Sequence, residues 1–173
     1  MKFFITAILP LFLLAACVTD DVPRNEGVSV GDRLPQFQIT LDNGADVSTD
    51  SLLGSVSVII FFSTSCTDCQ RELPRLNEVY THFKDDSGVI VFAVSREEQE
   101  QQVMSFWKEY SLTMPFSVQT DRYVYSLFAS FGVPRVYISD ASNIIVEAFD
   151  DSDLPSPEII INIIEQYSKE NIN

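Results

Sequence analysis

VSVIIFFSTSCTDC, residues 56–69, joins a predicted strand to two cysteines that are separated by two residues. The first seven residues are almost all β-branched or aromatic, which is typical of a strand buried on both faces. Beyond the cysteines, apolar residues recur at the spacing of a helix, at Leu73, Leu76, Val79, Tyr80 and Phe83. The sequence therefore predicts that Cys66 and Cys69 open a helix just after a buried strand.

The rest of the chain alternates between strand and helix patterns. Asn43-Gly44 lies between two short segments of weakly alternating polarity, which predicts an N-terminal β-hairpin over residues 37–48. Further strands are predicted over residues 89–94, 116–118, 136–138 and 144–149, and further helices over residues 103–110, 123–131 and 156–167. In the second of these helices, Leu127, Phe128 and Phe131 are expected to face inward. This order indicates the α/β class, with a central mixed sheet that has helices on both sides.

Composition limits the classes of function that fit this chain. Its 173 residues, of which 46% are hydrophobic, suit one folded domain. With 25 acidic residues against 11 basic ones the formal net charge is −14, which excludes the clustered cations that nucleic-acid binding requires. Three cysteines are too few for a disulfide-rich scaffold, and a single histidine, His82, makes a metal site hard to assemble. We therefore expect neither a metal nor an organic cofactor.

Residues 1–16 have the pattern of a signal peptide. Lys2 precedes an apolar run that is too short to span a bilayer as a helix. The run ends at Leu14-Ala15-Ala16-Cys17, which resembles the lipobox of bacterial lipoproteins and implies cleavage before Cys17 and lipidation of its thiol. Residues 17–27 would then form a polar tether, and residues 28–173 the folded domain. An ordinary secretory signal with an incidental cysteine is the alternative.

The placement of Cys66 and Cys69 favours redox chemistry. A thiol at a helix N-terminus lies near unpaired backbone N–H groups and the positive end of the helix dipole, and both stabilise its thiolate. Cys66 is therefore expected to attack a disulfide, and Cys69, one turn later, to resolve the mixed disulfide. A metal site would need more Cys or His ligands, and a structural disulfide would close too small a ring to stabilise the fold much. Both alternatives are less favoured than a redox pair.

Four segments of the sequence carry a family resemblance. They are VGDRLPQF at residues 30–37, FFSTSCTDC at residues 61–69, Glu72-Leu73-Pro74, and Gly132-Val133-Pro134 before a predicted strand. Together they resemble the thioredoxin superfamily, and within it the extracytoplasmic TlpA/ResA branch, over most of residues 28–167. The resemblance implies a thioredoxin-like fold in which Pro134 is cis and faces the cysteines. It also implies that the backbone of Val133 pairs with an extended substrate.

Glu98 is a candidate for proton transfer. The resemblance implies that an acid at this position lies near the buried sulfur, where it would accept the proton of Cys69. Its neighbours Glu97 and Glu100 make a solvated helix start the alternative explanation of the acidic run. Glu98 is preferred to Glu97 for the catalytic role.

The residues around the cysteines depart from the family pattern. Ser65 stands where the family usually has Trp, and Arg135 follows the predicted cis-proline where Thr is common. We therefore expect a smaller and more polar rim, with Ser65 in contact with the substrate. Trp107 lies on a later helix, where a core position is expected. Asp68, between the cysteines, opposes negative charge on its neighbours and predicts a more reducing couple.

These observations favour a membrane-tethered thiol-disulfide oxidoreductase of the cell envelope, outside the cytoplasm. Reduced Cys66 would attack a protein disulfide, Cys69 would release the product, and a membrane or periplasmic electron donor would reduce the pair again. A peroxiredoxin-like peroxide reductase is one alternative, although Ser63 and Ile59 stand where that family needs Thr and Pro. A surface-anchored binding module with an idle disulfide is the other.

Overall fold

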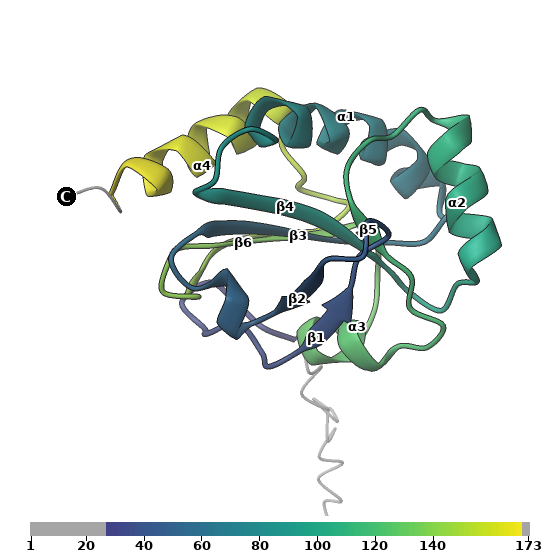
Figure 1. Cartoon of the computed structure of the whole chain (residues 1–173), viewed down its shortest axis with the longest axis horizontal. Helices are drawn as coiled ribbons and strands as arrows, with labels where there is room; N and C mark the ends of the chain where they lie inside the picture. Colours follow the sequence, from purple (N-terminus) through teal and green to yellow (C-terminus); the bar gives the residue numbers. More distant parts are fainter. Residues whose placement is uncertain (1–26, 171–173) are drawn as a thin grey trace, which may run out of the picture.

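A computed structural model describes residues 27–170, whose largest sheet has five strands (Figure 1). The strand order is β5-β4-β3-β6-β7, and the strands span Phe116–Ser117, Val89–Ser95, Val56–Phe62, Arg135–Ser139 and Ile145–Phe149. β3 pairs in parallel with β4, and β4 with β5, whereas β6 and β7 join in antiparallel fashion. The predicted mixed sheet is confirmed, and its central strand β3 leads directly to the cysteines.

Helices cover both faces of this sheet, as the sequence predicts. The elements outside the sheet are α1 (Thr67–Phe83), α2 (Glu100–Glu109), α3 (Tyr123–Phe128), α4 (Pro157–Glu170), the hairpin strands β1 (Gln38–Thr40) and β2 (Asp46–Ser48), and the 3-10 turn η1 (Asp50–Leu52). α1 and α4 pack beside each other on one face, while α3 and the hairpin lie on the opposite face (Figure 1). The predicted α/β fold with an N-terminal hairpin is therefore present.

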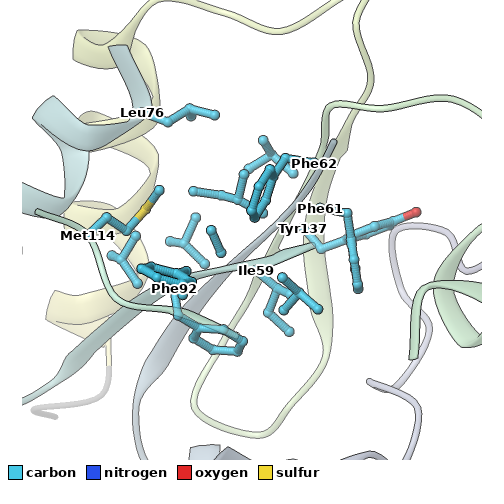
Figure 2. Close-up of a cluster of buried hydrophobic side chains, with 14 of the residues drawn as sticks. Ile59, Phe61, Phe62, Leu76, Phe92, Met114 and Tyr137 are labelled. Atoms are coloured by element: carbon cyan, nitrogen blue, oxygen red, sulfur yellow. The ribbon is translucent and has the colours of Figure 1, made fainter. Parts of the chain in front are cut away.

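Strand β3 forms the centre of the core, because each of its seven residues is buried. Side chains alternate along a strand, so Phe61 and Phe62 serve opposite faces. The ring of Phe61 lies 4.9 Å from that of Phe128 on α3, whereas the ring of Phe62 lies 4.9 Å from that of Trp107 on α2. Figure 2 shows Phe62 on the side of Leu76, and Phe61 beside Tyr137. The strand is thus held from both faces up to the residue where the cysteine loop begins.

The helix predicted over residues 123–131 is wrong at its C-terminal end. α3 ends at Phe128, and Ala129 has extended backbone angles. Phe131, which was expected to face inward, is 51% exposed, although Phe128 is fully buried as predicted. The helix stops because the chain must turn into the next strand, and Gly132 adopts the positive φ of 78° that the turn requires.

The predicted leader and anchor lie outside the described part of the chain. The signal peptide of residues 1–16, Cys17 and all but the last residue of the tether at 17–27 are not described, so these assignments stay predictions. Between residues 27 and 170, no helix has both the length and the apolar character needed to cross a membrane.

Candidate active site

Cys66 is the N-cap residue of α1, and three residues separate it from Phe62, where the buried strand β3 ends. Its extended backbone (φ −83°, ψ 120°) turns the chain into the helix, and its Sγ accepts a hydrogen bond of 3.5 Å from the backbone N–H of Cys69. The side chain is half-buried. The sulfur therefore accepts one of the free N–H groups at the start of α1, and a partner can still reach it.

Cys69 lies one turn further along the helix and has no exposed surface. Both cysteines are free thiols in this structure. Burial raises the pKa of the Cys69 thiol far above its ordinary value, and the neighbouring Cys66 raises it further. A backbone hydrogen bond from Ser63 and the positive charge of Arg96 lower this pKa. The pair thus consists of an accessible sulfur and a buried one that stays protonated at neutral pH.

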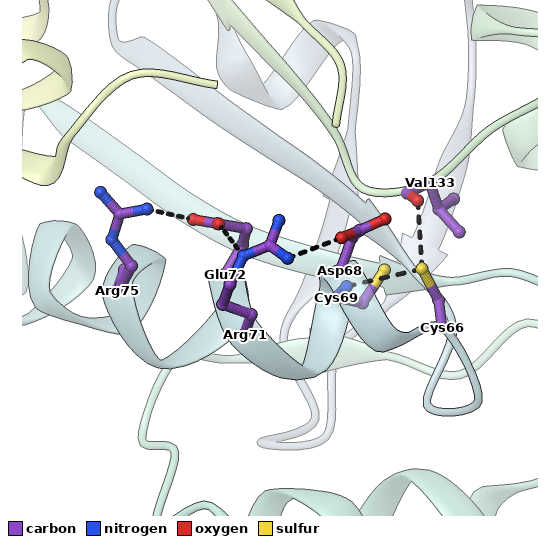
Figure 3. Close-up of polar contacts among 7 residues, drawn as sticks. All are labelled: Cys66, Asp68, Cys69, Arg71, Glu72, Arg75 and Val133. Carbon is purple, nitrogen blue, oxygen red and sulfur yellow. Dashed lines mark hydrogen bonds and ion pairs between the residues drawn. The ribbon is translucent and has the colours of Figure 1, made fainter. Parts of the chain in front are cut away.

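The Val133–Pro134 peptide bond is cis, as the family resemblance implies. The Cys66 thiol donates a hydrogen bond of 3.2 Å to the carbonyl oxygen of Val133 (Figure 3). The Tyr125 hydroxyl stabilises this loop, because it donates a hydrogen bond of 2.6 Å to the Gly132 carbonyl oxygen. Val133 and Pro134 therefore stand beside the accessible sulfur, where the sequence analysis predicts substrate contacts.

Glu98 holds the loop that leads from β3 to Cys66. Its Oε1 accepts hydrogen bonds from the Ser63 hydroxyl (2.8 Å), the Thr64 backbone N–H (2.6 Å) and the Thr64 hydroxyl (2.9 Å). Glu98 is only 5% exposed and precedes α2, which begins at Glu100, so it is not part of a solvated helix start. Within residues 27–170, its buried Oε2 has no hydrogen-bond partner.

Ser65 is exposed beside Cys66, and its hydroxyl shares a hydrogen bond of 3.0 Å with that of Ser63. The absence of a large ring at this position leaves the approach to Cys66 polar. On the other side of the site, Arg135 donates from Nε to the Phe131 carbonyl oxygen at 3.0 Å, and its guanidinium lies 5.5 Å from the centre of the Phe131 ring. Arg135, which the sequence analysis treats only as a departure, braces the turn before the cis bond.

The first turns of α1 carry a ladder of charged side chains (Figure 3). Asp68 and Arg71 form an ion pair of 2.7 Å, Arg71 contacts Glu72 at 2.7 Å, and Glu72 contacts Arg75 at 2.6 Å. Glu72 is the buried member, and both of its oxygens are paired. In the sequence, Glu72 stands out only as part of the family pattern. The three-residue spacing of opposite charges is the signal that could have predicted these ion pairs. Arg71 also neutralises part of the negative charge that Asp68 places near the sulfurs.

Arg96 is a site residue that the sequence analysis misses. It follows β4, and its backbone N–H donates a hydrogen bond of 3.0 Å to the Phe62 carbonyl oxygen. Its guanidinium carbon lies 5.1 Å from the centre of the Tyr125 ring. In the sequence, a lone arginine after a strand carries no signal, because only the fold brings it beside the end of β3.

The two thiols lie outside a large surface cavity of this protein. A cavity of about 940 Å³ lies between α2 and the β1–β2 hairpin, where Trp107, Leu112 and Phe116 line it together with polar residues. Its lining contains neither cysteine. Among residues 27–170, no three Cys, His, Asp or Glu side chains are grouped so that they could hold a metal ion. Cys66 instead lies half-buried at the N-terminus of α1, with the exposed Ser65 beside it.

Comparisons with known proteins identify the family of this chain. The model of the AhpC/TSA family matches residues 30–148. The thiol-disulfide oxidoreductase ResA of Oceanobacillus iheyensis is 31% identical over 144 residues, which cover 79% of this chain and 74% of the relative. ResA of Bacillus cereus is 27% identical over 122 residues, 70% of each chain.

Solved structures share the fold. A putative protein disulfide isomerase from Bacteroides thetaiotaomicron has a TM-score of 0.77 at 24% identity, covering 83% of this chain and 94% of the other. StoA from Bacillus subtilis has a TM-score of 0.63 at 20% identity, covering 75% of this chain and 96% of the other.

Proposed function

Because this chain belongs to the AhpC/TSA family and is a thiol-disulfide oxidoreductase of the ResA type, we propose that Cys66 and Cys69 are its redox pair. The pair would exchange disulfides with extracytoplasmic proteins and act as a reductant. One observation carries the proposal: Cys66 caps α1 and touches the Val133 carbonyl next to a cis-proline, with Cys69 buried one turn behind it.

The reaction has two steps whose electrons balance. First, the Cys66 thiolate attacks one sulfur of the substrate disulfide, so that a mixed disulfide forms and the second substrate sulfur leaves as a thiolate that takes up a proton. Second, Cys69 loses its proton and attacks Cys66 Sγ. The Cys66–Cys69 bond forms, the mixed disulfide breaks, and the substrate leaves with two thiols. The protein ends oxidised by two electrons, and the substrate ends reduced by two.

The loop at Val133 and Pro134 would dock the substrate. The Val133 carbonyl oxygen accepts a hydrogen bond from the Cys66 thiol in this structure. It is therefore a backbone acceptor beside the sulfur that would attack. An extended substrate segment can pair with such an acceptor whatever its side chains are. The exposed Ser65 would contact the substrate from the other side of the sulfur. This arrangement supports protein substrates of varied sequence.

Glu98 enters the proposal as the group that takes the proton of Cys69. Its support is the buried Oε2, which has no hydrogen-bond partner in the described part of the chain and so is available to a proton. Its other oxygen is fixed by Ser63 and Thr64, and Ser63 is also the residue whose backbone contacts the Cys69 sulfur. Cys69 and Glu98 thus both contact Ser63, which brings the proposed proton donor and acceptor to the same residue beside the end of β3.

Anchoring and location belong to the same proposal. Cys17 would carry the lipid, residues 17–27 would form the tether, and the domain would face the periplasm or the cell surface. Because such compartments oxidise thiols, a membrane or periplasmic electron donor would be needed to keep the pair reduced. Incorporation of labelled palmitate into the wild-type protein but not into Cys17→Ala would support the anchor, and equal labelling of both would contradict it.

Peroxide reduction is the competing activity, and one contact counts against it. Ser63, three residues before Cys66, stands where a peroxide reductase needs a hydroxyl directed at its thiol. That hydroxyl donates to Glu98 and also bonds Ser65. A test of hydrogen peroxide consumption by the reduced protein should therefore show no turnover beyond that of free thiols.

Mixed-disulfide trapping tests the proposal directly. In Cys69→Ala, Cys66 can still attack but the product cannot be released, so partner proteins from the cell envelope should accumulate as bands that a reductant removes. Cys66→Ala is the matched control: with Cys17→Ala present in both variants, its remaining thiol is the buried Cys69, and it should trap nothing. Trapping by neither variant would show that the disulfide is idle, as in a binding module. Trapping by Cys66→Ala alone would reverse the assigned roles.

A further inference from the structure

We infer that Tyr125 is a positioning residue for substrate binding: its hydroxyl orients the backbone of Val133, so that an extended polypeptide can pair there beside Cys66. The inference rests on the proposed function, because it concerns the docking of the substrate whose disulfide Cys66 attacks. The sequence gives no sign of this role, because Tyr125 falls within the helix predicted over residues 123–131.

Side chains hold the cis-proline loop, residues 129–134, which joins α3 to β6 and lies outside any helix or strand. Three consecutive carbonyl oxygens of this loop accept hydrogen bonds from side chains. The three pairs are Arg122 with Ser130 at 3.0 Å, Arg135 with Phe131 at 3.0 Å, and Tyr125 with Gly132 at 2.6 Å. The backbone that leads up to Val133 is therefore fixed at each of the three preceding residues.

The bond from Tyr125 acts on the peptide unit next to the sulfur. The Gly132 carbonyl and the Val133 N–H belong to one planar trans peptide, in which they point in opposite directions. Because the Gly132 oxygen is directed at Tyr125, the Val133 N–H points away from that buried side chain. The Val133 carbonyl oxygen accepts the hydrogen bond of the Cys66 thiol at 3.2 Å (Figure 3). An extended segment pairs with both the N–H and the C=O of a residue, and Tyr125 orients the first of them.

Tyr125 is itself held firmly enough to position a loop. Its side chain is 1% exposed, and its ring packs edge-on against that of Phe61 on β3 at 5.6 Å. The guanidinium carbons of Arg96 and Arg122 lie 5.1 Å and 5.4 Å from the ring centre. A loop that is ordered before the substrate arrives costs less conformational entropy on binding. Tyr125 should therefore affect the docking of a polypeptide and not the attack of the sulfur.

Two disulfides that share one leaving group separate docking from chemistry. One joins thionitrobenzoate to the central cysteine of a short peptide with blocked ends and no charged side chains, and the other joins it to mercaptoethanol. In both, the Cys66 thiolate attacks the alkyl sulfur, a mixed disulfide forms, and coloured thionitrobenzoate leaves with the electron pair of the broken bond. The full-length protein would carry Cys17→Ala and Cys69→Ala, which leave Cys66 as its one thiol.

Tyr125→Phe removes one hydroxyl and keeps the packed ring. It should lower the second-order rate constant for the peptide probe about three- to tenfold, which corresponds to one hydrogen bond, and leave that for the mercaptoethanol probe unchanged. Arg135→Met removes the bond to the carbonyl one residue further from Val133, so it should slow the peptide probe by less and again spare the small one. This second variant carries the test if Tyr125→Phe does not fold.

Tyr137 provides the matched control. It is also 1% exposed, its ring packs edge-on against Phe61 at 6.1 Å, and its hydroxyl donates to the Phe128 carbonyl oxygen at 3.2 Å, outside the cis-proline loop. Tyr137→Phe should therefore leave both rates unchanged. Equal slowing by Tyr125→Phe and Tyr137→Phe, equal slowing of both probes, or an unchanged peptide rate would overturn the inference. Release of thionitrobenzoate from neither probe by the parent protein would instead overturn the redox role of Cys66.

Discussion

Cys69 is a residue whose chemistry is set almost wholly by its surroundings. Its side chain has no exposed surface, and burial is the largest cause of its raised pKa. Cys66, the N-cap residue of the same helix, is half-buried instead. Its sulfur accepts a hydrogen bond from the backbone N–H of Cys69. Under the proposed function this difference assigns the two roles, because a partner can reach Cys66 and Cys69 would then release it.

The raised pKa of Cys69 predicts a loss of stability at high pH in the reduced protein. Unfolded chains lose the Cys69 proton near the ordinary cysteine pKa of about 8.5, whereas the folded chain keeps it. The wild type should therefore lose about 1.4 kcal/mol of unfolding free energy per pH unit above about pH 9, relative to Cys69→Ala. Urea denaturation of both proteins at a series of pH values measures this. A difference between them that stays constant above that pH would contradict the prediction.

Glu98 is predicted to stabilise the cysteine loop whatever its part in proton transfer. Glu98→Ala removes the acceptor of three hydrogen bonds and should lower the free energy of unfolding by about 2–3 kcal/mol. The control is Glu97→Gln, which alters an exposed ion pair with Arg122 of 3.4 Å and should cost less than about 1 kcal/mol. Equal losses in the two variants would show that the loop does not depend on Glu98.

At the scale of elements, the spacing of apolar residues predicted the strands and helices whose buried faces pack against other elements. Residues 56–62 form the predicted strand with the same bounds, because every position is apolar or small and is buried by two layers. The helix that begins after Cys66 is also confirmed, since its stripe from Leu73 to Phe83 faces the sheet. The sequence failed where tertiary contacts outweigh local pattern, as at Phe131, which ends on the surface.

Some residues of the candidate site could likewise be predicted from the sequence, and others could not. The cysteines, Val133 and the cis-proline could be predicted because a short motif and a family resemblance carry them. The hydrogen bonds of Glu98 and the position of Arg96 could not, because they depend on how β4 lies beside β3. Such contacts join strand ends that are distant in sequence, and no periodic pattern of residues predicts them.

Helix α2 is predicted to contribute to stability and not to exchange. Trp107 donates a buried hydrogen bond of 2.7 Å to the Met114 carbonyl oxygen and packs against Phe62 and Phe116. Trp107→Phe should cost about 1–3 kcal/mol of unfolding free energy through the unpaired carbonyl and the lost volume, with the rate of disulfide exchange unchanged. Urea denaturation followed by circular dichroism measures the loss. Met104→Ala, on the exposed side of the same helix, is the control and should change little.

At the scale of the whole molecule, the half-buried Cys66 and the buried Cys69 lie at one edge of the sheet, just beyond the carboxyl end of β3. β3 carries the pair from the centre of the core, the cis-proline loop leads into the adjacent β6, and Arg96 follows β4 on the other side. Three neighbouring strands thus meet at the site and fix the positions of its loops. The net charge of −14 distinguishes the molecule from nucleic-acid-binding proteins, and its effect on protein partners is limited by salt to short range.

The reduction potential of the Cys66–Cys69 couple tests the central claim most directly. The isolated domain would be equilibrated in glutathione redox buffers, alkylated and analysed by mass spectrometry, so that the fraction with an intramolecular disulfide is counted at each ratio. Since Cys69 is buried and its thiolate is disfavoured, we expect a reversible two-electron couple below about −180 mV, more reducing than protein disulfide isomerase. A potential above that value, or no reversible bond between the two sulfurs, would contradict the account.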